Sequence, residues 1–270
     1  IVKTIAGYGI TAPLFLSQND GTLMDLDFAR RYPVATFASG PTNSMRGAAV
    51  LSGMTDCAVV DVGGTTSDIG VLIHGFPREA TTAVTVAGVH TNFRMPDVLS
   101  IGIGGGSRVS PDGTEVGPDS VGFRLLEQAR VFGGETLTAT DIVVAAGMAD
   151  VGDKSLVKNL DRSIIDNAVA RIGRDVTEVI EQMRTSSADL PVVAVGGGSI
   201  LIPDVLKGFG TVHRPDHFEV ANAIGAAIAQ VGGQVDRVYN IGAGEREQVV
   251  EQARAEATEQ AVGAGADPDS

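Results

Sequence analysis

The sequence lacks several features that would point to a particular environment. Cys57 is its one cysteine, so no disulfide forms within the chain. No apolar run reaches the roughly 18 residues that span a bilayer, and the first residues lack the basic and then apolar pattern of a secretory signal. Because Cys57 lies in an apolar stretch, we expect an inert buried thiol in a reducing compartment, which predicts a cytoplasmic location.

Basic charge is also scarce. The chain has 20 Lys and Arg residues against 33 Asp and Glu residues, which gives a net charge of −13. A surface of this sign repels nucleic-acid backbones and anionic lipids, so neither nucleic acid nor a membrane is an expected partner. Glycine is abundant, with 35 residues, but it clusters in loops without a period, and this excludes a collagen-like chain.

Apolar strand patterns alternate with helical patterns along the chain, and this predicts an α/β fold. With 270 residues the chain can bury one large core or two smaller ones. A stretch rich in loops is expected over 93–120. The patterns predict strands at 12–16, 34–38, 57–62, 69–73, 81–89 and 190–195, and helices at 40–53, 138–149, 162–185, 218–231 and 244–262.

The first informative motif is the glycine turn inside CAVVDVGGTTSDIGVL, residues 57–72. Adjacent glycines let several backbone N–H groups converge on a phosphate, and two threonines add hydroxyl donors. The flanking aspartates can hold water on Mg²⁺ or orient an attacking water. An ordinary hairpin needs only one or two special turn residues. We therefore expect phosphate contacts from Gly63, Gly64, Thr65 and Thr66, catalytic roles for Asp61 and Asp68, and a metal-ligand role for Asp61.

The second motif is the glycine turn inside VVAVGGGSILIPDVL, residues 192–206, which follows a strand and is expected to lead into a helix. The GxGxxG spacing of a dinucleotide fingerprint is absent. Flat glycine backbone can still lie against a purine and its sugar, and Ser199 can cap a helix or bond a ribose. Together the two turns predict one ATP site, to which this motif contributes Gly196, Gly197, Gly198 and Ser199.

A third glycine-rich turn lies within residues 101–107. Two interpretations stay open: a mobile loop, or a lining of the nucleotide or acyl-phosphate pocket by Gly104, Gly105, Gly106 and Ser107. Asn222 is either a polar group that finds a backbone partner or a neighbour of the second turn. Candidates for substrate contact are His90, Arg94 and Asp97. His213 and His217 have the spacing of a metal pair, but Arg214-Pro215 interrupts the helix, so a surface turn is expected.

The order of these parts resembles the sugar-kinase, heat-shock-chaperone and actin ATPase superfamily, which has a ribonuclease H-like fold. In that fold a helix precedes the second phosphate hairpin, as 40–53 precedes 59–72 here, and a helix of small residues follows the adenosine motif. Within the superfamily, the sequence motifs are more similar to those of hydantoinase A and the ATP-dependent oxoprolinases. The strings that carry this similarity are GPTNSMRGA at 40–48, DVGGTTSD at 61–68, MPD at 95–97 and GGGS at 104–107.

The resemblance implies an ATP-dependent enzyme that opens a cyclic amide such as a hydantoin or 5-oxoproline. ATP phosphorylates the ring carbonyl oxygen, Mg²⁺ accompanies ATP, and a partner subunit takes part. Related subunits of ketone carboxylases activate their substrate in a similar way. Two alternatives on the same fold stay open: an ATPase switch of the chaperone or actin type, and a small-molecule kinase, for which no aspartate base is identified.

The resemblance also implies a division of the chain. Residues 1–39 are expected to be the tail end of a first ATPase domain, 40–231 the second ATPase domain with an insertion around 90–190, and 232–270 a C-terminal helical segment. Because the chain starts at Ile1 and contains no second DxGGT-like string, we expect a piece of a longer protein that folds but turns over ATP negligibly by itself.

Overall fold

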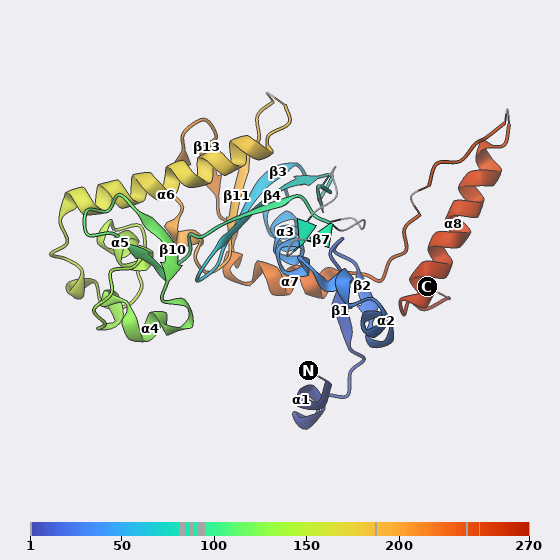
Figure 1. Cartoon of the computed structure of the whole chain (residues 1–270), viewed down its shortest axis with the longest axis horizontal. Helices are drawn as coiled ribbons and strands as arrows, with labels where there is room; N and C mark the ends of the chain where they lie inside the picture. Colours follow the sequence, from blue (N-terminus) through green and yellow to red (C-terminus); the bar gives the residue numbers. More distant parts are fainter. Residues whose placement is uncertain are drawn as a thin grey trace.

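A mixed sheet lies at the centre of the computed structural model (Figure 1), which describes residues 2–80, 85–86, 89–90, 95–186, 188–235, 237–242 and 244–269. The sheet has seven strands in the order β12-β13-β11-β3-β4-β5, and the seventh, β8, pairs with β4. The strands are β3 (Cys57–Val62), β4 (Ser67–Ile73), β5 (Phe76–Pro77), β8 (Val98–Ile101), β11 (Val192–Val195), β12 (Val205–Leu206) and β13 (Gly210–His213).

The centre of the sheet is the predicted β3–β4 hairpin. The two strands are antiparallel, and Asp61 is the cross-strand partner of Asp68. Strand β11 runs parallel to β3 on the other side and places Val195 beside Asp61. The ends of β3 and β11 therefore lie together, and each strand continues directly into one of the glycine turns.

Helices cover both faces of this sheet (Figure 1). Val60, Val62 and Ile69 share a core with α6 (Arg162–Met183) and α5 (Ala139–Ala145) on one face. Alternate residues point the other way, so Val59 and Leu72 pack with α3 (Ser39–Ser52) and α7 (Ala221–Ile228). Cys57 lies in this second core with no exposed surface. Burial, aided by the nearby charge of Asp56, raises the pKa of its thiol to about 12.

The helices α3 and α7 cross at unusually short range. A Cβ atom on Gly47 would lie 1.9 Å from the carbonyl oxygen of Ala221, and one on Gly225 would lie 1.8 Å from that of Asn43. Only glycine permits this approach of the two backbones. The relative position of α3 and α7 is thereby fixed by backbone contact.

The segment between β8 and α6 forms a small subdomain with its own core of Ala129, Val131, Val144 and Val157. Most of its elements are short and are joined by turns. They are β9 (Ser107–Val109), β10 (Val116–Ser120), η2 (Gly122–Arg124), α4 (Leu125–Gln128), η3 (Arg130–Phe132), α5 and η4 (Lys154–Leu156).

Residues from the N-terminal and the C-terminal part of the described chain share a separate small core of Met24, Ala29 and Ala264. No helix among the described residues is both long and apolar enough to cross a membrane. The elements here are α1 (Val2–Gly7), β1 (Phe15–Ser17), β2 (Leu23–Asp25), α2 (Leu26–Arg31), η1 (Pro33–Thr36) and α8 (Arg246–Gly263); the short strands β6 (Thr85–Val86) and β7 (Val89–His90) pair with each other.

Several expected elements were wrong. The strand expected at 34–38 is absent: residues 34–36 belong to the 3₁₀ turn η1, in which the Thr36 hydroxyl donates to the Pro33 carbonyl. The strand expected at 12–16 starts only at Phe15. The stretch 93–120, expected to be rich in loops, also contains the strands β8, β9 and β10. The strand expected at 81–89 is two short strands, with 81–84 and 87–88 outside the described residues.

The helix expected after the second glycine turn is a single 3₁₀ turn, η5 (Ser199–Leu201). Ile202 is extended, with a ψ of 127°. It precedes Pro203, and a residue before proline is pushed out of the helical region by the proline ring. The chain therefore returns to the sheet as β12 and β13.

Candidate functional site

The turn between β3 and β4 presents open backbone at its tip. Gly63 donates from its N–H to the carbonyl of Thr66 at 2.9 Å, which closes the turn. Gly63, Gly64, Thr65 and Thr66 are all exposed, and a Cβ on Gly64 would meet no atom within 4 Å. The tip is therefore unobstructed, as a phosphate-binding turn requires.

The third glycine-rich turn packs directly on this tip. Gly105 and Gly106 donate from their N–H groups to the carbonyls of Gly63 (3.0 Å) and Gly64 (2.7 Å). A Cβ on Gly104 would lie 2.4 Å from the backbone nitrogen of Thr65. The residues 104–107 are buried, and the Ser107 hydroxyl accepts from the Gly104 N–H at 2.9 Å. This turn is thus a buried backbone layer under the hairpin tip.

The second glycine turn reaches the same place from β11. Gly198 donates to the carbonyl of Val62 at 2.8 Å. Gly196 has a φ of 82°, and a Cβ on it would lie 2.4 Å from Oδ1 of Asp61. Ser199 is fully buried, and its hydroxyl has no hydrogen-bond partner within the described part of the chain. Only the 3₁₀ turn η5 begins at Ser199, so Ser199 does not cap a longer helix.

The three turns enclose one cavity of about 320 Å³. The side of the cavity that the glycines form is open, because a Cβ on Gly64 or on Gly197 would have no neighbour within 4 Å. Its other side is apolar, apart from Thr140, whose hydroxyl donates to the Gly105 carbonyl at 2.8 Å. The lining residues are Gly63, Gly64, Gly105, Gly197, Gly198, Leu125, Phe132, Thr140, Val151 and Ile200.

The apolar wall of this cavity was not predicted from the sequence. Leu125, Phe132 and Val151 come from the subdomain between β8 and α6. The fully buried Asp141 sets the position of Phe132, because its carboxylate accepts from the N–H of Val131 at 2.6 Å. The same carboxylate completes a capping box at the start of α5 with Thr138. The sequence signal that could have identified Asp141 is the Thr-x-x-Asp spacing of a capping box.

The two aspartates of the hairpin do not line the cavity. They alternate with the residues that face α6, so both lie on the α3 side of the sheet. The Ser100 hydroxyl donates to Asp68. Burial raises the pKa of Asp61 above its ordinary value; the nearby Ser44 hydroxyl opposes this rise, and the charge of Asp68 adds to it.

The carboxylates suit a magnesium ion that keeps most of its own water. Among the described residues, no group of three or more His, Cys, Asp or Glu side chains could hold a metal ion. Mg²⁺ usually takes only one or two carboxylates together with phosphate oxygens and water. Asp61, half-buried beside Asp68, fits such a role next to a bound phosphate.

Asp97, another predicted contact residue, is not among the residues that line this cavity. Asp97 forms an ion pair with Arg78 at 2.7 Å. Arg94 and the side chain of His90 lie outside the described residues. His213 ends β13, and His217 has a left-handed φ of 63°, so the expected surface turn is present there.

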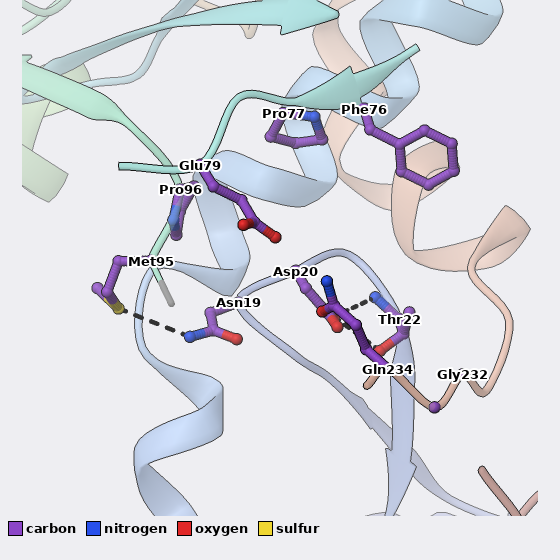
Figure 2. Close-up of a pocket in the computed structure, with 11 residues that line it drawn as sticks. Asn19, Asp20, Thr22, Phe76, Pro77, Glu79, Met95, Pro96, Gly232 and Gln234 are labelled. Atoms are coloured by element: carbon purple, nitrogen blue, oxygen red, sulfur yellow. Dashed lines mark hydrogen bonds between the residues drawn. The ribbon is translucent and has the colours of Figure 1, made fainter. Parts of the chain in front are cut away.

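A second cavity, of about 310 Å³, is built differently (Figure 2). Side chains line most of it, and they come from the turn between β1 and β2, from β5 and the residues after it, from Met95–Pro96 and from 232–234. Glu79 extends toward the turn that carries Asn19 and Asp20, and the Asn19 amide contacts the Met95 sulfur at 3.6 Å (Figure 2). It contains none of the predicted nucleotide-binding residues.

Comparison with solved structures shows where this fold occurs. The chain is similar to acetone carboxylase in its nucleotide-free form, with a TM-score of 0.69 and 20% identity over 100% of this chain and 44% of that one. It is also similar to the ATP-dependent caprolactamase of Pseudomonas jessenii, with a TM-score of 0.66 and 18% identity over 94% and 43%. The expected α/β fold is confirmed, and the chain spans less than half of either protein.

Sequence comparison gives the family. The gamma subunit of acetophenone carboxylase from Aromatoleum aromaticum is 33% identical over 119 residues, which are 42% of this chain and 16% of that protein. The family model described as hydantoinase/oxoprolinase matches residues 1–153 of the 270. A match over more than half of the sequence establishes membership. The chain belongs to the hydantoinase/oxoprolinase family.

Proposed function

We propose that the cavity between the three glycine turns binds ATP with Mg²⁺. The purine lies between Gly197 and the apolar wall that includes Phe132, and the phosphates lie over Gly63 and Gly64. The observation that carries this proposal is the convergence of three distant turns on one cavity with bare backbone at Gly64 and Gly197. Backbone N–H groups without a Cβ are suited to bind phosphate, and apolar side chains are suited to a base.

The reaction proposed is ATP-dependent hydrolysis of a cyclic amide of the hydantoin or 5-oxoproline type. The ring carbonyl oxygen forms a bond to the γ-phosphorus, the bond from this phosphorus to the bridging oxygen breaks, and ADP leaves. Water attacks the activated carbon, the ring C–N bond breaks, and an acyl phosphate remains. A second water releases phosphate and leaves the carboxylate. The assigned role of Asp61, with Asp68, is to hold or orient water beside the phosphate.

The proposed enzyme is longer than this chain. Thr65 and Thr66 are exposed at the hairpin tip, so a second domain or subunit has room to complete the phosphate site from that side. This fits the division proposed from the sequence, with 40–231 as the second ATPase domain, 1–39 as the end of the first and 232–270 as a C-terminal segment. A partner subunit and a cytoplasmic location belong to the same proposal.

A second candidate is activation of a ketone for carboxylation. It is favoured by the 33% identity to the gamma subunit of acetophenone carboxylase. The same phosphate and base sites serve both reactions, because each begins with phosphoryl transfer to a carbonyl oxygen. The two candidates therefore differ in the substrate that stimulates ATP turnover.

The experiment is a measurement of ADP release by the full-length enzyme with hydantoins, 5-oxoproline, ketones with bicarbonate, sugars or unfolded peptide. Stimulation by a cyclic amide, with the ring-opened acid as product, supports the first candidate. Stimulation by a ketone together with bicarbonate selects the second. Stimulation by a sugar or by unfolded peptide contradicts both.

A further inference from the structure

A cavity of about 610 Å³ lies between α6 and residues 203–207, and we call it the α6 cavity. One wall is a stripe of α6 between residues 162 and 178, whose members recur every three or four positions and therefore share one side of the helix. The other wall is residues 203–207, with Ala146 and Met148 beside it. The volume lies within the range of small-molecule pockets. The α6 cavity shares no lining residue with the cavity between the glycine turns.

Both walls of the α6 cavity carry apolar side chains. Val169 and Ala170 come from α6, and Val205 and Leu206 come from the opposite wall. Leu206 is buried, but Val205 is 64% exposed. Covering such an exposed apolar side chain with an apolar ligand removes it from water and is favourable. The walls are therefore suited to the apolar part of a ligand.

Gly173 keeps the middle of the α6 cavity open. A Cβ on it would lie 3.5 Å from Cγ of Pro203 and 4.0 Å from Cδ2 of Leu206, which is ordinary van der Waals contact. Gly173 thus differs from Gly47 and Gly225, where a Cβ would collide with backbone atoms. Glycine inside a helix is less favourable than alanine, and packing does not require it at this position. Its effect is to leave the space next to Pro203 and Leu206 unfilled.

Positive charge at the α6 cavity is only partly neutralised. Of the charged residues that line it, Arg162 and Asp166 pair with each other at 2.9 Å. The other three are Arg174, Glu178 and Lys207, which are exposed and have no ion pair within the part of the chain that the structure describes. Two cations against one carboxylate leave a positive charge here, although the whole chain has a net charge of −13. The cavity therefore favours an anion over a cation.

We propose that the α6 cavity binds a small amphipathic anion, namely a carboxylate on an apolar chain. The apolar chain lies beside Gly173 between α6 and residues 203–207, and the carboxylate reaches Arg174 and Lys207. An apolar lining with a few charged groups that fix orientation is the usual composition of a small-molecule site. This inference does not rest on the proposed function, because it involves none of the residues assigned to the nucleotide.

The first test is a calorimetric titration of the full-length enzyme with octanoate, 1-octanol and octylammonium, which share one apolar chain and differ in charge. We expect saturable binding of one octanoate per chain, and octylammonium should bind about tenfold more weakly. Arg174→Gln with Lys207→Gln should weaken octanoate binding by about tenfold and change 1-octanol binding by less than about twofold.

The matched control for these charges is Lys154→Gln with Lys158→Gln. Both lysines are exposed and neither lines the α6 cavity, so the affinity for octanoate should stay at the wild-type value. The absence of saturable octanoate binding contradicts the proposal. Octylammonium binding as tight as that of octanoate contradicts it as well, and so does an equal loss of octanoate and 1-octanol affinity in Arg174→Gln with Lys207→Gln.

The second test fills the α6 cavity. Gly173→Leu places a side chain in the space next to Pro203 and Leu206, so octanoate and 1-octanol should both bind about tenfold more weakly. Gly173→Ala is the matched control, because its methyl group fits at van der Waals distance and the same glycine is removed from the helix. Both variants should at least keep the wild-type Tm, since alanine and leucine favour a helix more than glycine does. Equal octanoate affinity in the two variants contradicts the assigned place of the ligand, and the charge variants test the proposal independently of this substitution.

Discussion

The two sides of the β3–β4 hairpin tip differ in what they offer a ligand. On the cavity side, bare backbone at Gly64 and Gly197 faces apolar side chains such as Phe132. On the α3 side, Asp61 and Asp68 lie beside serine hydroxyls. In the proposed function, the cavity side binds the nucleotide without taking part in the reaction. The carboxylates on the α3 side act on water without contacting the purine base. Substitutions on the cavity side should therefore change affinity, and those on the α3 side should change turnover.

The largest effect is expected from Asp61→Asn. We expect kcat for ADP release to fall by about a thousandfold, within the range for a group that handles a proton or orients water, while the Kd for Mg–ATP changes much less. Asp56→Asn is the control at the opposite end of β3, where Asp56 is exposed and accepts from Thr55 and His74. Full ADP release by Asp61→Asn would remove the chemical role of the α3 side.

The second effect concerns the backbone layer beneath the tip. Gly104→Ala places a methyl group 2.4 Å from the Thr65 nitrogen, so we expect a loss of about 3 kcal/mol in the free energy of unfolding. Gly64→Ala meets no atom within 4 Å and should keep the wild-type Tm while Mg–ATP binds more weakly. Urea unfolding measures the free energy of unfolding of both variants. Equal stability of the two variants contradicts the buried packing of the third turn.

Asp141→Asn is expected to have a smaller effect. The substitution removes one acceptor from a fully buried carboxylate that binds the N–H of Val131 and caps α5. A loss of about 2 kcal/mol in the free energy of unfolding is expected. Because Phe132 follows Val131, the Kd for Mg–ATP should rise as well. Thermal unfolding with and without nucleotide measures both, and an unchanged Tm contradicts the assigned role.

The smallest effect is expected from Phe132→Ala. Loss of the ring from the cavity wall should weaken Mg–ATP binding by about tenfold, which corresponds to roughly 1.4 kcal/mol of apolar burial. The value of kcat should stay unchanged, in contrast to Asp61→Asn. Phe123→Ala is the control, because Phe123 is 93% exposed and lies outside the cavity. A reduced kcat with unchanged Kd would reverse the division between the two sides.

The hairpin and the turns could be predicted because their signals are local. An apolar run, two glycines and a return strand specify β3–β4 within 17 residues, Cys57–Ile73. Alternation along β3 also places Asp61 on the same face as Cys57 and Val59. That this face borders α3 depends on the packing of helices far apart in the sequence. The sequence therefore indicates that the carboxylates share a face, but not which helix lies against them.

The cavity wall could not be predicted for a related reason. Leu125, Phe132 and Val151 lie on short elements and loops with no strong periodic pattern, and the buried carboxylate of Asp141 holds the backbone next to Phe132 by accepting from the N–H of Val131. Residues 34–38 were wrongly expected to form a strand, because the β-branched Val34 and Thr36 favour a strand but also occur in the 3₁₀ turn η1 (Pro33–Thr36), which its own hydrogen bonds close. Tertiary contacts decided the first case and local hydrogen bonds the second, and propensity decided neither.

The central claim is that three glycine turns form one nucleotide site. Its most direct test is a calorimetric titration of the full-length enzyme and of Gly197→Val with Mg–ATP. The account predicts saturable binding of one nucleotide per chain to this site, a much weaker affinity in Gly197→Val and the same Tm without nucleotide. Equal affinity of the two proteins for Mg–ATP, or no binding by the wild-type enzyme, would contradict it.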